Sequence, residues 1–327
     1  MALKFIAALS LVTVAGCAVF TDRQASGRVV QAERNFPPEG QFIDVDGRKV
    51  HAVVEGSGPD VIMIHGAGGN TREFTFEFLD RLKDRYRVII FDRPGLGYTD
   101  RTSDIYDSVF TTQAESPAEQ AAMLQSAAQQ LGVKNAILVG HSYGATVALA
   151  WALNHPETTA GVVNLAGPSH PWPGSVGPFY TVPGSALGGI FVPPLVGALT
   201  TDQRIEGAIP PIFAPQPVPD GYIDHIGGRL TVRPDSFRAN ARQVSTLRPH
   251  VVEMAPRYAA ELKMPLEIIH GAEDQTVPLN IHSVPLSRVV PHANLVVLDN
   301  VGHMPHHARP DLVEDAIARI AAQAGLR

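Results

Sequence analysis

The amino-acid sequence predicts an α/β fold built on a mainly parallel β-sheet. Short, uninterrupted apolar runs recur along the chain, and amphipathic stretches of helical character separate them. Runs without polar alternation are typical of strands buried on both faces of a parallel sheet, and their alternation with helices indicates strand–helix–strand units. Glycine and polar residues follow the runs, at the sheet edge where such folds bind ligands.

The apolar runs define the expected order of strands. A hairpin comes first, because runs at 42–45 and 50–54 flank Asp46-Gly47, a dipeptide that favours a two-residue turn. The other expected strands cover residues 61–64, 88–91, 136–139, 161–165, 266–269 and 295–298. The clearest expected helices cover residues 117–131, 145–154 and 310–322.

Composition limits the class of function. The chain has 327 residues, of which 45% are apolar and 18% charged, so it can bury a sizeable core. The formal net charge is −6 and no basic run occurs, so a nucleic-acid partner is not expected. The single cysteine forms no cluster with histidines, so neither a zinc site nor another metal is expected.

The first residues have the composition of an export signal. Lys4 is followed by an apolar run that ends at Cys17, and this run is shorter than the roughly 20 residues of a membrane span. Its end, Val14-Ala15-Gly16-Cys17, resembles the lipobox of bacterial lipoprotein signals. An uncleaved N-terminal anchor or an ordinary buried first helix is the alternative.

The lipobox resemblance implies a location for the protein. Residues 1–16 would be a cleaved signal peptide, and Cys17 would be lipidated as the new N-terminus. Residues 17–40 are mostly polar with Gly and Pro, so they are expected to form a tether between the lipid and the folded domain. The protein would then be exported and anchored to a membrane of the bacterial cell envelope, on the periplasmic side.

Residues 168–262 interrupt the alternation of strands and helices. Their first half is dense in Pro and Gly, and their second half, from about residue 233, has helical character. A structureless loop of this length is uncommon, so a cap of helices and irregular turns over the sheet edge is expected, with a long packed loop as the alternative. The core then consists of residues 41–167 and 263–327.

Gly140-x-Ser142-x-Gly144 joins a predicted buried strand to a helix rich in small residues. A sharp strand-to-helix turn strains the serine backbone, and glycines on both sides avoid the clashes of a Cβ. The Ser142 hydroxyl is therefore expected to project from the sheet edge, beside the positive end of a helix dipole. These features predict a nucleophile.

Five motifs carry a family resemblance. In chain order they are His65-Gly66-Ala67-Gly68-Gly69, Asp92-Arg93-Pro94-Gly95-Leu96-Gly97-Tyr98, Gly140-His141-Ser142-Tyr143-Gly144, Gly271-Ala272-Glu273-Asp274-Gln275-Thr276-Val277-Pro278 and Gly302-His303. Together they resemble the α/β-hydrolase superfamily, from about Phe42 to the C-terminus. The resemblance implies an α/β-hydrolase fold and a serine hydrolase that needs no cofactor.

The resemblance also implies roles for the site residues. The family order is nucleophile, acid, histidine, which matches Ser142, Asp274 and His303. The backbone N–H groups of Ala67 and Tyr143 would form the oxyanion hole.

Other candidates for these roles fit less well. Glu273 is the alternative to Asp274, and His306 and His307 are alternatives to His303 that are expected to be exposed or to begin a helix. His65 and His141 lie within motifs and are expected to be structural.

The expected reaction is hydrolysis of a carboxylic ester through an acyl-enzyme intermediate. Ser142 argues against epoxide hydrolases and haloalkane dehalogenases, which need an aspartate there. Carbon–carbon bond hydrolases, lactonases, amidases and cofactor-free perhydrolases keep a serine and stay open, as does a non-catalytic binding protein of this fold. The apolar cap predicts a small-molecule substrate with an apolar acyl or alkyl group.

Overall fold

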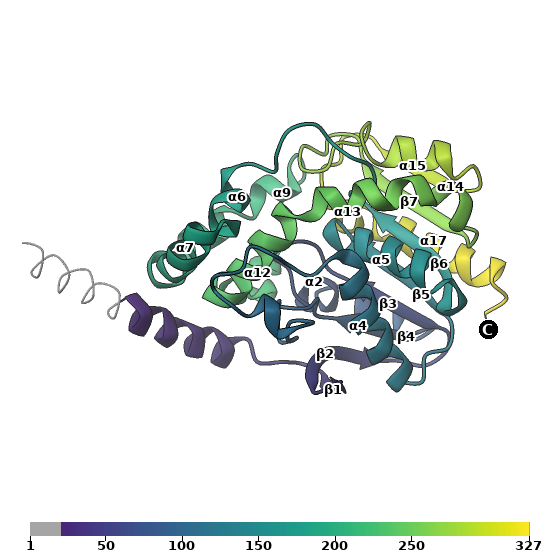
Figure 1. The fold of residues 1–327 in the computed structure, drawn as a ribbon. Helices are drawn as coiled ribbons and strands as arrows, with labels where there is room; N and C mark the ends of the chain where they lie inside the picture. The colour runs from purple at the N-terminus through teal and green to yellow at the C-terminus, as the bar shows by residue number, and fades with distance from the viewer. Residues whose placement is uncertain (1–20, 327) are drawn as a thin grey trace, which may run out of the picture.

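The computed structural model describes residues 21–326. Its centre is an eight-stranded sheet in the order β1-β2-β4-β3-β5-β6-β7-β8, with helices on both faces (Figure 1). β2 runs antiparallel to β1 and β4, and every later pair of neighbours is parallel, so the predicted mainly parallel sheet is confirmed. The strands are β1 Gln41–Val45, β2 Arg48–Glu55, β3 Asp60–Ile64, β4 Arg87–Phe91, β5 Ala136–His141, β6 Thr159–Leu165, β7 Leu266–Gly271 and β8 Asn294–Leu298.

The central strands are mostly apolar because both of their faces are covered. In β3, Val61 and Met63 pack into one hydrophobic cluster, while Ile62 and Ile64 pack into another on the opposite face. Successive side chains of a strand point to opposite faces, so a strand with two buried faces cannot alternate with polar residues.

Helices on the two faces supply the partners of these strands. α4 (Pro117–Gln130) and α5 (Tyr143–Asn154) cover one face, and α3 (Phe78–Leu82) and α17 (Pro310–Gln323) cover the other. The remaining helices of the core are α2 Arg72–Thr75, α15 Ser283–Val289 and α16 Pro305–Ala308, with 3-10 turns at Asp104–Tyr106 and Pro156–Thr158.

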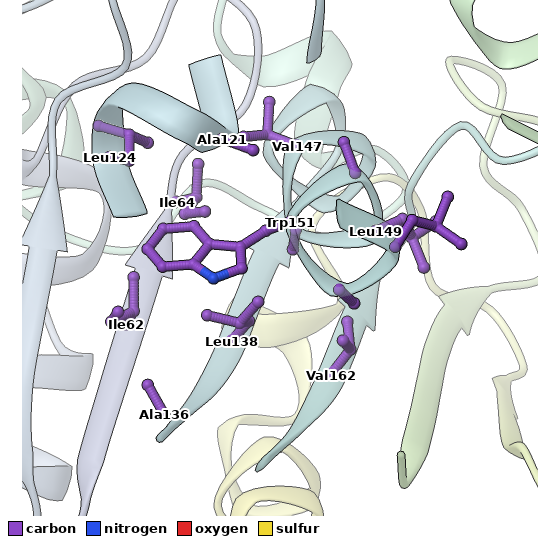
Figure 2. Packing of buried hydrophobic residues seen from close by; sticks show 14 of the residues in the cluster. Ile62, Ile64, Ala121, Leu124, Ala136, Leu138, Val147, Leu149, Trp151 and Val162 are labelled. Atoms are coloured by element: carbon purple, nitrogen blue, oxygen red, sulfur yellow. The ribbon is translucent and has the colours of Figure 1, made fainter. Parts of the chain in front are cut away.

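Trp151 of α5 is the largest fully buried side chain. Its indole lies against Ile62 and Leu138 of the sheet and faces Leu124 of α4 (Figure 2). The indole N–H donates to the Thr158 hydroxyl at 3.2 Å, so the polar atom of this buried ring is satisfied. Trp151 therefore joins the two helices of this face to the sheet.

The segment between β6 and β7 is rich in helices. They are α6 Pro178–Gly184, α7 Ala186–Leu199, α8 Asp202–Gly207, α9 Pro210–Phe213, α10 Tyr222–Ile226, α11 Gly228–Thr231, α12 Pro234–Ser245, α13 Leu247–Met254 and α14 Tyr258–Glu261, with a 3-10 turn at Ala255–Arg257. We call residues 168–262 the insertion; its role as a cap stays a prediction.

The first half of the insertion is more helical than its proline content suggests. Pro193 and Pro194 lie inside α7, where proline normally disfavours a helix. The side of α7 that includes Pro193 is buried, and α7 packs against α12. Tertiary packing therefore outweighs the local preference that favours irregular turns here.

The predicted tether contains a helix. Residues 21–35 are helical, and Ala25 and Ala32 are buried on the side that faces the protein. Arg28 donates to the Thr200 carbonyl at 2.6 Å, and Glu33 pairs with Arg233 at 2.8 Å. This stretch is therefore docked on the insertion. The predicted signal peptide and Cys17 lie outside the described residues.

Within residues 21–326, no single helix is long and apolar enough to cross a membrane. The pair α6 and α7 reaches the required length and composition together, but the two helices are bent by 108° at Ser185.

Removing the Trp151 side chain should destabilise the fold. Trp151→Ala leaves a cavity between two helices and the sheet, so we expect the free energy of unfolding to fall by about 3–5 kcal/mol in urea titrations. Val252→Ala, at an exposed position of α13, is the control and should change it by less than about 0.5 kcal/mol. A loss at Trp151 no larger than this control would show that the indole does not join these layers.

Candidate active site

Ser142 lies at the sharp turn between β5 and α5. Its φ is 52° and its ψ is −122°, a conformation that strains an ordinary residue. A Cβ on Gly144 would come within 2.1 Å of the Ile64 carbonyl oxygen, and one on Gly140 within 2.5 Å of Ala145 Cα. Gly144 therefore lets α5 approach the end of β3, and Gly140 lets the first turn of α5 fold back close to β5.

The structure brings together Ser142, His303 and Asp274 from three separate segments. His303 Nε2 lies 2.9 Å from Ser142 Oγ, and His303 Nδ1 lies 2.7 Å from Asp274 Oδ2. Since a carboxylate can only accept, Nδ1 carries the proton and Nε2 is left to accept the hydrogen bond of the Ser142 hydroxyl. All three residues are at most 8% exposed.

Both carboxylate oxygens of Asp274 accept hydrogen bonds. Oδ1 accepts from the backbone N–H groups of Thr276 and Val277 at 2.8 and 2.9 Å. Oδ2 lies near His303 and also 3.1 Å from His270 Nε2. Burial alone would raise the pKa of Asp274, but the hydrogen bonds from His270 and His303 outweigh burial and hold it well below 3.8. The acid is therefore ionised at neutral pH.

His270 is a site residue that the sequence motifs do not assign. It lies at the end of β7, and its Nε2 also donates to the Val277 carbonyl at 2.8 Å. Its Nδ1 lies 2.6 Å from the Ser283 hydroxyl, so both ring nitrogens are used. His270 thereby fixes the turn that presents Asp274. The only signal in the sequence is its position at the carboxyl end of a predicted strand.

The loop after β3 lies next to Ser142. A Cβ on Gly66 would meet Ser142 Cβ at 3.1 Å, which places the following residue, Ala67, beside the serine. Tyr143 is the first residue of α5, so its backbone N–H has no acceptor inside the helix. These are the two groups that the motifs predict for an oxyanion hole.

Arg93 holds the loop after β3 through hydrogen bonds to its backbone. Its guanidinium donates to the carbonyls of His65 and Gly66 at 3.0 and 3.1 Å, and lies 4.3 Å from the centre of the Tyr143 ring. It also donates to Gln120 and to Gln243 of α12. Full burial lowers the pKa of Arg93 to about 10, which leaves the side chain charged at neutral pH. A single cation therefore joins both sides of the predicted oxyanion hole.

The insertion also holds the loop directly. The Gly68 N–H donates to Asn240 Oδ1 of α12 at 2.7 Å, and the Thr231 hydroxyl of α11 donates to the Gly68 carbonyl. Gly68 has a φ of +66°, a conformation that glycine adopts without strain. Both backbone groups of this glycine therefore depend on residues far along the chain.

The two other motif histidines make structural contacts. His141 Nε2 donates to the His303 carbonyl at 2.9 Å, and His65 Nε2 accepts from the Arg93 N–H at 3.0 Å. Burial lowers the pKa of both imidazoles, that of His65 to about 4, so both are neutral at neutral pH.

Glu73 organises a buried polar cluster behind His303. Glu73 Oε1 accepts from Nε2 of His306 and His307 at 2.9 and 2.8 Å, and Oε2 accepts from the Tyr222 hydroxyl at 2.6 Å. His306 is fully buried and the His307 side chain is 2% exposed, so these histidines are not exposed. Both lie in the first turn of α16 (Pro305–Ala308), so the alternative expectation, that they begin a helix, is confirmed. The hydrogen bonds to this carboxylate satisfy one ring nitrogen of each buried imidazole. The cluster joins α2, α16 and the insertion.

The donor atoms of Glu73, His306 and His307 lie within 4.8 Å of one another, close enough to hold a metal ion. A metal on Nε2 would leave each Nδ1 as a proton donor that needs an acceptor. Neither Nδ1 has a hydrogen-bond partner among residues 21–326. With Nε2–H donating to the carboxylate, each Nδ1 is instead an unprotonated acceptor, which fits these surroundings better.

Glu73→Gln should lower stability in a pH-dependent way. Burial raises the pKa of Glu73, but hydrogen bonds from the two histidines outweigh burial and hold it well below 4.5. The stability that the carboxylate supplies is thus present above pH 4.5 and lost as the pH falls toward the lower folded-state pKa. We expect unfolding titrations to show a loss of about 1–3 kcal/mol at neutral pH that shrinks in acid.

Glu77→Gln is the matched control for this experiment. Glu77 pairs with Arg81 at a partly exposed site, where ion pairs contribute less than about 1 kcal/mol. A Glu73→Gln loss that stays constant with pH, or that matches the control, would contradict the role given to the carboxylate.

Comparison with known proteins gives the same fold. The chain is 27% identical to 2-hydroxymuconate semialdehyde hydrolase from a Pseudomonas species over 306 residues, which cover 90% of this chain and 99% of the relative. A meta-cleavage product hydrolase (CumD) superposes with a TM-score of 0.68 at 21% identity, over 87% of this chain and 98% of its own. An esterase from Exiguobacterium antarcticum superposes with a TM-score of 0.64 at 22% identity, over 86% and 99%.

The family assignment rests on a match to a family model over most of the chain. Residues 61–316 match the alpha/beta hydrolase family, and this range includes Ser142, Asp274 and His303. The sheet order and the turn at Ser142 agree with that match. The chain is therefore a hydrolase that belongs to the alpha/beta hydrolase family.

Proposed function

We propose that the protein is a serine hydrolase that cleaves a carboxylic ester through an acyl-enzyme intermediate. The observation that supports this most directly is the hydrogen-bond series Asp274–His303–Ser142 at a strained strand-to-helix turn. A serine hydroxyl is a weak nucleophile until a base accepts its proton. His303 Nε2 is placed to accept it, and ionised Asp274 stabilises the imidazolium that results.

The reaction then proceeds in two steps. Ser142 Oγ attacks the ester carbonyl, and the N–H groups of Ala67 and Tyr143 stabilise the oxygen anion that forms. His303 returns the proton to the leaving alcohol as the carbon–oxygen bond breaks. Water then attacks the acyl-enzyme and gives its proton to His303. The bond between the acyl carbon and Ser142 Oγ breaks, the carboxylic acid leaves, and His303 returns the proton to Ser142 Oγ. Losing one oxyanion donor typically slows such a reaction about 10²–10³-fold.

The composition of the predicted cap and the contacts of Arg93 favour an apolar, uncharged substrate. No Lys, Arg, Asp or Glu occurs between Glu157 and Asp202, a stretch that includes the first helices of the insertion. Arg93, the cation that contacts the oxyanion loop, is fully buried and donates to protein acceptors. An apolar acyl or alkyl group fits these residues better than a charged one.

A carbon–carbon bond hydrolase is the second candidate. The relative with 27% identity is named for 2-hydroxymuconate semialdehyde, and the match extends over 90% of this chain. The same serine, histidine and aspartate could serve that reaction. A muconate carries a carboxylate, however, and would need a cation free to bind it. The guanidinium of Arg93 already donates to two backbone carbonyls, and this favours an ester over a muconate as the substrate.

Ser142→Ala should abolish both labelling and turnover. Wild-type protein should react with a fluorophosphonate probe and hydrolyse esters in a panel of esters, lactones, amides and vinylogous diketones. We expect Ser142→Ala to lose the label and at least about 10³-fold of kcat/KM. Ser169→Ala is the control, because Ser169 is also buried but its hydroxyl donates to the His282 carbonyl. Labelled protein that cleaves only the diketones would favour the second candidate, and an unlabelled wild type would refute the serine mechanism.

We also propose that the protein is exported and held in the bacterial cell envelope by lipid on Cys17. The lipobox-like residues 14–17 support this location. Mass spectrometry of the mature protein should find acylated Cys17 as the first residue, and Cys17→Ser should lose the acyl chains. A mature protein that begins at Met1 would refute the anchor and leave the hydrolase proposal untouched.

A further inference from the structure

α7 is apolar on all sides and exposes its largest side chains. One row of positions is exposed and carries large apolar side chains, with Leu187 72%, Phe191 62% and Leu199 57% exposed. The opposite row is buried and includes the small residues Gly189 and Gly197. Surface helices of soluble proteins normally bury their large apolar side chains and expose polar ones. The exposed side of α7 therefore carries the large apolar side chains, and its buried side carries mostly small ones.

The exposed apolar area continues onto α6. Phe179 is 64% and Val182 48% exposed, and the whole stretch between Glu157 and Asp202 lacks Lys, Arg, Asp and Glu. We call the exposed apolar side chains of both helices the α6–α7 face. Its members are Phe179, Val182, Leu187, Phe191, Leu195 and Leu199.

Close packing prevents α7 from turning this face inward. A Cβ on Gly197 would meet Pro234 of α12 at 3.0 Å, and one on Gly189 would meet Arg242 at 3.1 Å. Arg242 is itself held by the carbonyls of Ser108 and Val109. The two glycines thus fix the side of α7 that contacts α12, and the large side chains remain outside.

The N-terminal helix brings the start of the chain to the same side of the molecule. Arg28 of this helix donates to the carbonyl of Thr200, directly after α7. Figure 1 shows the first described turn of this helix next to α7. Residues 1–20, which hold the apolar run that ends at Cys17, join the protein there. The first described residues of the chain and α7 are therefore neighbours.

We propose that the α6–α7 face docks on the surface of a lipid bilayer. Moving an apolar face without charges from water into the boundary between headgroups and acyl chains lowers the free energy, because apolar surface is removed from water. The bend of 108° between α6 and α7 suits helices that lie in this boundary, since a span would have to run nearly straight. The neighbouring N-terminal segment supports a bilayer as the occupant, because both would meet the same membrane.

A single labelled cysteine can test this contact. Cys17 is the only cysteine, so Cys17→Ser supplies a full-length background without thiols or acylation. Phe191→Cys, labelled with an environment-sensitive nitrobenzoxadiazole dye, should brighten several-fold when phosphatidylcholine–phosphatidylglycerol vesicles are added. Val297→Cys on β8, 41% exposed, is the matched control and should not brighten. Because the face is uncharged, brightening should persist at high salt.

A second variant measures the contribution of the face to binding. In the same background, Leu187→Ser with Phe191→Ser should lower the vesicle partition coefficient at least about tenfold in sedimentation. Val297→Ser should leave the coefficient unchanged. Turnover of a water-soluble ester should be the same in all three proteins, which would show that the paired change leaves the site intact.

Other occupants would give different results. Brightness before vesicles that rises with protein concentration would show that a second copy covers the face. Brightness before vesicles that is independent of concentration would show that residues 1–20 cover it. Equal signals at positions 191 and 297, or none at 191 while the protein sediments with vesicles, would overturn the proposal. So would a failure to sediment with vesicles.

Discussion

The close approach of α5 to the end of β3 is the constraint on which the site depends. Gly144 allows this approach because any Cβ would overlap the carbonyl of Ile64. At the same turn the backbone of Ser142 has a positive φ, and the Tyr143 N–H, at the start of the helix, has no acceptor within it. The hydroxyl and one predicted oxyanion donor are thus positioned by the same contact.

Buried charged groups supply the second layer of organisation. Asp274 and Glu73 are both inside the protein, and each is surrounded by donors from several segments. Arg93 is buried in the same way and donates to carbonyls of the loop that follows β3. An unpaired buried charge is strongly destabilising, so each group fixes its partners in one arrangement. The arrangement of the site is therefore held by buried charges that do not themselves react with substrate.

The sequence predicts well what local patterns encode, and less well what distant partners decide. The strands of the sheet and the turn at Ser142 follow from apolar runs and from glycine spacing. The burial of His306 depends on Glu73, more than two hundred residues earlier, and no local pattern signals that pairing. Pro193 lies in a helix because α7 packs on α12, which outweighs its own preference. Residues 21–35 form a docked helix for a similar reason, since their partners Thr200 and Arg233 lie in the insertion.

The two hydrogen bonds to Gly68 have a consequence for how this fold can be divided. Asn240 and Thr231 belong to the insertion, yet they fix a loop of the core at the point where the predicted oxyanion hole forms. Replacing the insertion would therefore remove both hydrogen-bond partners of Gly68. A chimera that grafts another family member's insertion onto this core must carry over an acceptor and a donor for Gly68, or redesign the loop with it. The residues that form the site therefore include Thr231 and Asn240 of the insertion, although the insertion is a separate segment of the chain.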